Sequence, residues 1–212
     1  MPSTQQLRTD RLVLRRWRDG DRAPFAAMNA DPEVMEYFPA ALTSDESDAF
    51  IDRIEAGFER HGFGLWAVEI AETGRFIGFT GLSVPRFEAH FTPAVEIGWR
   101  LVRPGWGHGY ASEAARRALG FAFDDLGLGE VVSFTTRANL RSQAVMERIG
   151  MTHDPADDFD HPLLEEGHPF RPHVLWRMTA GHRPDRQVGG RARSGSIVTG
   201  GLPPRLGGRP PA

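Results

Sequence analysis

The sequence contains neither cysteine nor lysine. Without cysteine the chain forms no disulfide, offers no thiolate to a metal and has no cysteine nucleophile. All 25 of its Lys+Arg residues are arginine, which excludes the lysine of a phosphate-binding NTPase loop and a lysine Schiff base. Any catalysis must therefore rely on other side chains and on the backbone.

Long apolar runs are also absent. No segment approaches the roughly 18 apolar residues that cross a bilayer, and the N-terminus lacks the charged and then apolar pattern of a signal peptide. We therefore expect a cytoplasmic protein without a membrane partner. With 212 residues, 40% of them hydrophobic, the chain is long enough for one domain with a substantial core.

The C-terminal segment differs from the rest of the chain in charge. Residues 181–212 contain six arginines against the single acid Asp185, and they lack aromatic residues. We predict an acidic folded domain over residues 1–180 and a disordered, Gly/Pro/Arg-rich tail over 181–212. An acidic domain argues against a nucleic-acid partner and suits a cationic amine. A charge run without interleaved aromatics is typical of a solvated tail rather than an RNA-binding one. A homodimer is left open.

Hydrophobic periodicity alternates between strand-like and helix-like segments. Asp19 or Asp21 is expected to cap the first helix, and Thr43 with Glu46 forms a capping box for the second. The expected strands are 11–17, 65–70, 75–82, 94–102, 131–136 and 173–178, and the expected helices are 19–30, 43–60, 110–125 and 139–150. Glycines at 62, 74, 127, 129 and 150 mark the turns between them.

A glycine-rich segment, RPGWGHGYASEA at residues 103–114, lies between a predicted strand and a predicted helix. A helix N-terminus carries unpaired N–H groups and a partial positive charge, and glycines let an anion approach the backbone. The dinucleotide pattern G-x-G-x-x-G fails in both registers, because its sixth place is Tyr110 or Ser112. The segment therefore predicts an anion site of another type.

The segment resembles the pyrophosphate-binding loop of the GNAT superfamily of N-acyltransferases. The family pattern is Gln or Arg, two residues, Gly, one residue, and Gly or Ala; here it runs from Trp106 to Ala111, and Trp106 departs from it. The segments TDRLVLRRW, EIGWRL, NLRS and ERIGM resemble, in that order, the RimJ/RimL-like branch, the ribosomal-protein N-terminal acetyltransferase type. The later DFDHPLLEEGHPFRPHVLWRM also resembles a segment of that branch, so the likeness covers about residues 7–179.

The resemblance implies an α+β fold in which a mixed sheet, flanked by helices, is splayed between strands 94–102 and 131–136. Acetyl-CoA would lie in this gap. Main-chain groups of Leu101, Val102 and Arg103 would pair with its pantetheine arm, which Asn139 would also contact. The pyrophosphate would bind the loop formed by Trp106, Gly107, His108, Gly109, Tyr110 and Ala111. Core packing is the alternative role for Trp106, and plain solvent exposure is the alternative for His108.

The implied chemistry is attack of an amine on a thioester, which needs a base, an oxyanion donor and an acid. Glu96 interrupts an apolar strand and is the candidate base, acting through water; alternatively it is an exposed residue or a partner of Arg100. Met146 stands where many GNAT members carry a tyrosine acid. Ser142 is then the nearest hydroxyl, which the resemblance places near the thiol, although it could simply satisfy its own helix backbone.

Residues 154–172 form a long predicted loop with six acids and four prolines. Such loops are usually lids or binding elements. We expect this one to form the acceptor side of the site, with Asp158 and Asp160 attracting a cationic amine; an acidic surface loop is the alternative. His161, His168 and His173 lack the spacing and the cysteine partner of a metal site, so no metal is predicted.

Two functions follow. The first is an N-acetyltransferase that transfers acetyl from acetyl-CoA to a protein N-terminus or a small-molecule amine, by direct attack in a ternary complex, because no cysteine exists to carry the acetyl group. The second is a GNAT module that binds acyl-CoA or a partner without turnover, which the missing tyrosine favours.

Overall fold

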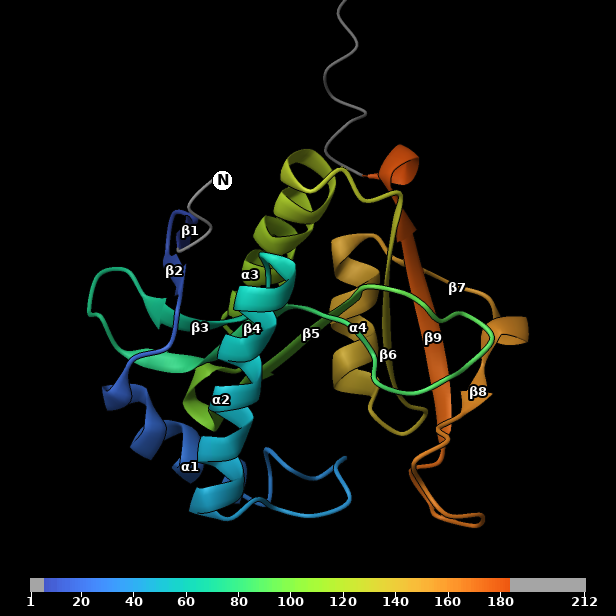
Figure 1. Cartoon of the computed structure of the whole chain (residues 1–212), viewed down its shortest axis with the longest axis horizontal. Coiled ribbons are helices and arrows are strands. Elements are labelled where there is room, and N and C mark those ends of the chain that lie inside the picture. The colour runs from blue at the N-terminus through green and yellow to red at the C-terminus, as the bar shows by residue number, and fades with distance from the viewer. Residues whose placement is uncertain (1–5, 184–212) are drawn as a thin grey trace, which may run out of the picture.

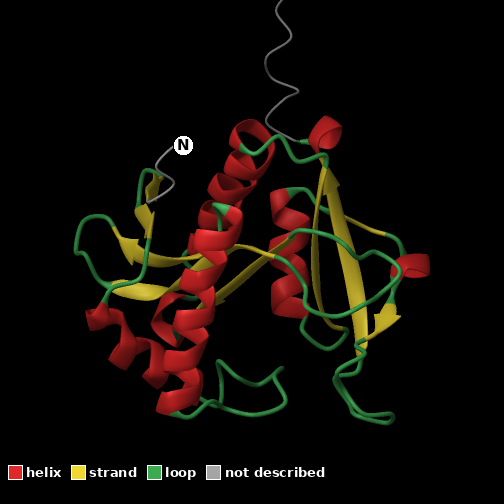
Figure 2. Cartoon of the chain, viewed as in Figure 1, coloured by secondary structure: helices red, strands yellow, loops and turns green. Residues whose placement is uncertain are grey.

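The computed structural model describes residues 6–183, which form one mixed sheet with helices on it (Figures 1 and 2). The strand order is β1-β2-β3-β4-β5-β6-β9-β7, and β8 pairs with β9 outside this path. The strands are β1 Gln6–Arg8, β2 Leu12–Arg15, β3 Leu65–Ile70, β4 Phe76–Ser83, β5 Glu96–Leu101, β6 Glu130–Thr136, β7 Thr152–His153, β8 Phe159–Asp160 and β9 Pro172–Thr179. All neighbours are antiparallel except β5 and β6.

Four α-helices flank the sheet in the described part of the chain: α1 Arg22–Ala30, α2 Ser44–His61, α3 Tyr110–Gly120 and α4 Leu140–Ile149. Helices α1 and α2 pack on each other, and α3 packs along β4 and β5. Apolar side chains of these helices and of β2 to β6 form the main core, with Trp66 and Phe25 fully buried within it. A second, smaller cluster around Phe91 and Leu175 lies by β6 and β9.

The N-caps of the first two helices lie at positions that the sequence predicts. The Thr43 hydroxyl accepts from Glu46 N–H at 3.2 Å, so the predicted capping box of α2 is confirmed. Asp21 is the N-cap of α1, as predicted, although its side chain accepts no capping hydrogen bond from the first turn of that helix. Asp21 instead accepts two hydrogen bonds from the buried Arg15 guanidinium, at 2.6 and 2.9 Å. A charge-assisted pair satisfies this carboxylate better than local capping does.

Some expected elements are broken up or joined by short ones. The expected strand 11–17 is β2 alone, and β1 precedes it. The helix expected over 110–125 is α-helical to Gly120 and continues as a π-type turn over Phe121–Asp125. The short strands β7 and β8 were not predicted, because two-residue strands leave no periodic signal.

The splay in the sheet lies between β5 and β6, as predicted. These parallel strands share one register pair, Glu96 with Val132, whereas β5 pairs with β4 along its whole length. The contact is reinforced by Val132 N–H, which donates to Val95 O at 2.9 Å, and by the Ser133 hydroxyl, which donates to Ile97 O at 2.9 Å. Beyond Ile97 the strands separate, so one edge of β5 has no sheet partner.

The end of the described chain stays attached to the domain. Ala180–His182 form a 3-10 turn, and Arg183 Nη1 donates to Asp124 Oδ1 at 2.6 Å. Most of the tail predicted for 181–212 lies outside the described residues. No helix within residues 6–183 combines the length and the apolarity needed to cross a membrane.

Candidate active site

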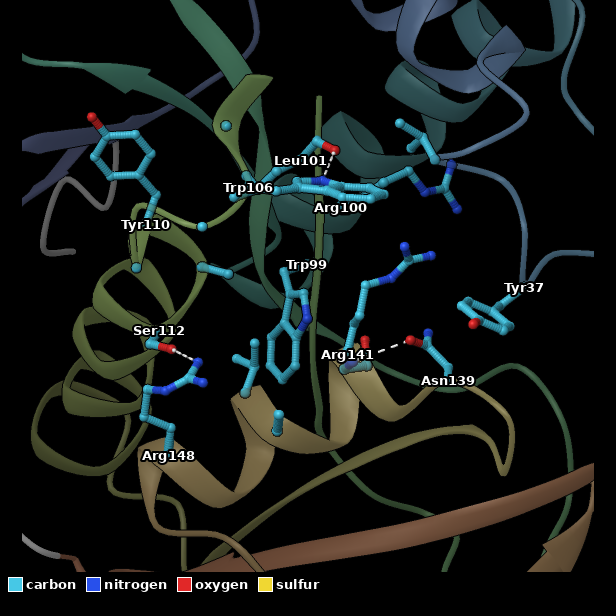
Figure 3. A pocket seen from close by; sticks show the side chains of 18 of the residues that line it. Tyr37, Trp99, Arg100, Leu101, Trp106, Tyr110, Ser112, Asn139, Arg141 and Arg148 are labelled. Carbon is cyan, nitrogen blue, oxygen red and sulfur yellow. Dashed lines mark hydrogen bonds between the residues drawn. The ribbon is translucent and has the colours of Figure 1, made fainter. Parts of the chain in front are cut away.

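A cavity of about 590 Å³ opens beside the free edge of β5 (Figure 3). Its walls come from the end of β5, the glycine-rich loop, the first turn of α3, the length of α4, and the segment between α1 and α2. These elements are distant in sequence and meet only because the sheet splays. The cavity is therefore a product of the topology.

The glycine-rich loop turns its backbone toward this cavity. Gly107 and Gly109 have φ angles of 80° and 78°, a conformation that side chains with a Cβ rarely adopt. Gly109 is the N-cap of α3 and offers no side chain to its first turn. The N–H groups of residues 107–112 donate no hydrogen bond to any other described residue. They form a ready site for an anion at a helix N-terminus.

Among residues 6–183, three arginines line the cavity and no aspartate or glutamate does. They are Arg100 from β5 and Arg141 and Arg148 from α4. Arg148 Nη1 donates to the Ser112 hydroxyl at 3.3 Å, which places it at the first turn of α3. In a chain with 28 Asp+Glu against 25 Lys+Arg, such a lining is a local positive field suited to a polyanion.

Trp106 organises the mouth of the cavity. Its indole N–H donates to the Leu101 carbonyl at 2.9 Å (Figure 3). Two guanidinium groups lie over its ring, that of Arg103 at 4.9 Å and that of Arg141 at 4.5 Å from the centroid. Arg141 also forms an ion pair with Glu36. The Trp106 side chain thus packs against the end of β5 and also forms part of the cavity wall. It combines features of the two roles that the sequence suggested, core packing and contact with the cofactor.

The free backbone groups of β5 lie nearer its middle than the sequence indicated. The carbonyls of Val95 and Ile97 point toward β6, so strand alternation places the N–H and C=O of Trp99 on the same edge, where β6 has moved away. The carbonyl of Leu101 already accepts from Trp106, and Val102 N–H already donates to Ile77 O at 2.9 Å. Trp99 therefore offers the open pair of groups to an extended ligand.

A second cavity, of about 410 Å³, lies on the other side of the same opening. Both cavities are lined by Tyr37, Phe38, Trp99, Arg100, Asn139 and Ser142. The second is lined in addition by Glu96, by the aromatic residues Phe79 and Phe134, and by part of the loop before β9. Two ligands bound in these cavities would meet at the shared wall.

Glu96 is the carboxylate of the second cavity. Its Oε2 accepts from the Ser83 hydroxyl at 3.2 Å, and it forms no ion pair with Arg100 or any other described residue. Burial raises the pKa of Glu96 to about 7, and the hydrogen bond from Ser83 only partly opposes this shift. A carboxylate with a pKa near neutrality can accept a proton under physiological conditions. Of the alternatives raised by the sequence, pairing with Arg100 is wrong.

Comparison with known proteins decides the family. A family model described as an acetyltransferase (GNAT) domain matches residues 11–152. The chain belongs to this family. The protein is thus an acetyltransferase with the GNAT fold that the sequence indicated. Acetyltransferases of this family use acetyl-CoA.

The relatives of this acetyltransferase support the assignment. It is 32% identical over 152 residues to the uncharacterized protein YkkB of Bacillus subtilis, covering 71% of this chain and 87% of that protein. It is 37% identical over 151 residues to the FsC-acetyl coenzyme A-N(2)-transacetylase of Aspergillus fumigatus, covering 66% of this chain but only 63% of that protein. A crystal structure of an acetyltransferase from Agrobacterium tumefaciens matches with a TM-score of 0.67 and 30% identity, covering 82% of this chain and 93% of the other.

Most of the residues predicted to bind the cofactor line the first cavity of the acetyltransferase. They are Leu101, Trp106, Gly107, Gly109, Tyr110, Ala111, Asn139 and Ser142. Val102, Arg103 and His108 are outside the lining. Arg103 Nε donates to Glu33 at 2.9 Å, and the ring of His108 stacks on Tyr110 with its centroid at 5.4 Å.

The side chains at the start of α4 differ in whether they are already hydrogen-bonded within the protein. Asn139 is the N-cap: its Oδ1 accepts from Ser142 N–H at 3.1 Å, and its Nδ2 donates to the Thr135 hydroxyl at 3.1 Å. The Ser142 hydroxyl has no hydrogen bond to another described residue, although it lines both cavities. It does not satisfy its own helix backbone. Met146, at the place of the family's usual tyrosine, is buried and lines the second cavity.

The loop predicted to hold the acceptor reaches the second cavity through other residues than those expected. His161, Leu164 and Phe170 line it, whereas Asp158 and Asp160 do not. Asp158 is engaged with His153 at 2.7 Å and with Arg137 at 3.2 Å, and Asp160 lies 3.4 Å from Arg171. Within residues 6–183 no group of three or more His, Asp or Glu side chains is placed to hold a metal ion.

Sequence reasoning missed several residues of the site. Tyr37 and Phe38 lie in the segment between two helices, and nothing in their spacing points to a cavity more than 60 positions away. Arg141 and Arg148 carried a usable signal: they are seven residues apart, about two helical turns, and so lie on one face of α4.

Proposed function

We propose that this acetyltransferase transfers the acetyl group of acetyl-CoA to a primary amine by direct attack within a ternary complex. The observation that carries the proposal is the pair of cavities with a shared wall beside the splay. One is built for an anionic, extended donor and the other contains a proton acceptor. No cysteine is available to hold the acetyl group between two half-reactions.

The first cavity suits the donor. The N–H groups at Gly107 to Ala111 and the guanidinium groups of Arg141 and Arg148 would hold the pyrophosphate. The backbone of Trp99 would pair with the amides of the pantetheine arm as β6 pairs with the start of the same strand. This arrangement directs the thioester toward the shared wall, where Ser142 lies.

The transfer step needs one proton acceptor and one proton donor. The amine nitrogen attacks the thioester carbonyl carbon, the new N–C bond forms, and the C–S bond breaks with its electron pair on sulfur. The amine proton passes to Glu96, directly or through water, and the thiolate takes a proton to leave as free CoA. The unpaired hydroxyl of Ser142 is proposed to stabilise that thiolate.

Glu96 is suited to its role by its pKa of about 7. At mildly alkaline pH most Glu96 side chains are deprotonated and can accept a proton, whereas in acid they are protonated. Activity that depends on it should therefore rise with pH through neutrality. Ser142 is not ionised at any of these pH values, so it imposes no such profile.

A paired measurement tests the proposal. CoA release is followed with acetyl-CoA and a panel of primary amines, and binding of CoA is measured by calorimetry. Turnover together with binding at the first cavity is the expected result. Binding without turnover of any amine would overturn the catalytic proposal and favour the binding module. Absence of CoA binding would overturn the placement of the donor.

The finer assignments suggested by the sequence belong to the same proposal. The ordered motifs support the RimJ/RimL-like branch, and the name of the Aspergillus relative supports a nitrogen acceptor and acetyl-CoA as donor. The loop before β9 is proposed to form the acceptor side through His161, Leu164 and Phe170, with Asp158 and Asp160 farther out. Cytoplasmic location, a homodimer, and the domain boundary at residue 180 stay predictions.

A further inference from the structure

Arg100 is a half-buried cation that lacks an anionic partner in the described part of the chain. It forms no ion pair with any residue among 6–183, and its Nε is buried without a hydrogen-bond acceptor in that part of the chain. Burial lowers the pKa of Arg100 to about 10, and no acid opposes this shift. The guanidinium is still charged at neutral pH. A buried charge without a counter-ion is costly, so this position is suited to an anion that arrives from outside.

The surroundings hold Arg100 in place without neutralising it. Its Nη1 donates to Asn29 Oδ1 at 2.6 Å, and Asn29 Nδ2 donates in turn to the Ser47 hydroxyl at 3.1 Å. The guanidinium lies over the ring of Phe38 at 4.0 Å and near that of Phe79 at 5.6 Å. Amide and rings fix the direction of the cation, and they leave its charge available to a ligand.

Glu96 and Arg100 lie on one face of β5 and line the second cavity together. They are four positions apart, about 13 Å along a strand, and the Glu96 side chain extends toward Gly98. Gly98 lies between them on the same face, and a Cβ built on it would meet only Glu96 Oε1, at 3.8 Å. The two opposite charges therefore flank an open space instead of pairing with each other.

The rest of the second cavity combines many aromatic rings with the hydroxyl and amide side chains of Ser83, Ser133, Thr135, Thr136, Asn139 and Ser142. Its walls include Phe134, Phe170, Leu164 and the imidazoles of His161 and His173. Burial lowers the pKa of His161, and it lowers the pKa of His173 to about 4, so both rings are neutral at physiological pH. Such a wall favours an apolar or flat aromatic group, which can stack against the rings.

We propose that the acceptor is a free amino acid with an apolar, preferably aromatic, side chain. Its amine lies against Glu96, its carboxylate pairs with Arg100, and its side chain enters the aromatic part of the second cavity. This inference rests on the proposed function and resolves the acceptor that the function leaves open. A protein N-terminus is excluded by it, because its first carboxyl group is consumed in a peptide bond.

Two substrates that differ only in the carboxylate test the inference. L-phenylalanine and phenethylamine share the amine and the ring, so their ratio of kcat/KM isolates the carboxylate. We expect L-phenylalanine to be favoured at least tenfold, and we expect Arg100→Gln to bring the ratio to within about twofold. Arg60→Gln removes an exposed arginine of α2 and should leave the ratio unchanged. A preference for phenethylamine, for putrescine or for a peptide N-terminus would overturn the inference while the transferase function stands.

A binding measurement separates this inference from the transfer reaction itself. N-acetyl-L-phenylalanine should bind the CoA complex more tightly than N-acetylphenethylamine, by calorimetry, whether or not turnover is seen. Asn29→Asp provides a second route if Arg100→Gln does not fold, because it places a carboxylate against Arg100. It should remove the preference for the carboxylate and change the Kd of CoA less than twofold. Equal binding of the two products to the unmodified protein would contradict the proposal.

Discussion

Among the described residues, the first cavity is lined by three arginines and the N-terminus of α3, whereas the second is lined by many aromatic rings and one carboxylate, Glu96. The first gathers most of its groups from two continuous segments, 105–112 and 139–148. The second draws on β4, β5, β6, β9 and two loops. The lining of the first cavity, the proposed donor site, is therefore encoded in short segments of the chain, whereas that of the second, the proposed acceptor site, depends on how the whole sheet is assembled.

The largest expected effect comes from removing the proton acceptor of the second cavity. Glu96→Gln keeps the size of the side chain and should lower kcat roughly 100-fold, because a general base contributes about that much. The rise of kcat/KM with pH through about 7 in the unmodified enzyme should be lost. CoA release across pH measures both, with the exposed Glu130→Gln as control. Full activity of Glu96→Gln at every pH would remove this residue from the mechanism.

The next effect concerns the backbone of the first cavity. Gly109→Val should raise the Kd of CoA at least tenfold, about 1.4 kcal/mol, because a β-branched residue resists a φ of 78° and obstructs the approach of a phosphate. Gly127→Val is the matched control, since Gly127 has a φ of 66° and lies outside both cavities. Calorimetry that finds equal Kd values for Gly109→Val and the unmodified protein would rule out this placement of the pyrophosphate.

A smaller effect is expected from the charge of the first cavity. Arg148→Gln should raise the Kd of CoA roughly fivefold at low salt, because it removes one of the two cations proposed to hold the pyrophosphate. The difference should shrink near 1 M salt, where the Debye length is about 3 Å. Arg60→Gln changes the net charge equally and serves as control. If the two variants behave alike, Arg148 makes no contact with the ligand.

The smallest effect is expected at the shared wall. Ser142→Ala should lower kcat about threefold and leave the Kd of CoA unchanged, because water can replace one neutral hydrogen-bond donor. Steady-state kinetics and calorimetry together measure this split. Loss of CoA binding in this variant would show that the serine supports the cavity wall and does not act on the leaving thiolate.

The contrast between the cavities also explains what could be predicted. The loop from Gly107 to Ala111 could be proposed as an anion site because a strand, a glycine turn and a helix follow one another in the sequence. Glu96 could be proposed as a base because it interrupts an apolar strand, and both proposals still await a test. The proposed role of Arg100 was missed, because its lack of an acidic partner depends on which residues of other elements pack around it, and the sequence does not show this. The partner of Asp21 was not predicted for the same reason, because Arg15, which donates to its carboxylate, lies in β2.

The place of β9 in the sheet has a consequence for biosynthesis. This last strand, Pro172–Thr179, pairs with β6, β7 and β8 and forms the centre of their half of the sheet. On the ribosome, β1 to β5 can assemble while the later strands still lack their common neighbour. The wall made by β6 and α4 is completed only when residue 179 has left the exit tunnel. A nascent chain stalled before residue 172 would thus contain the glycine-rich loop of the first cavity and lack His173, which lines the second.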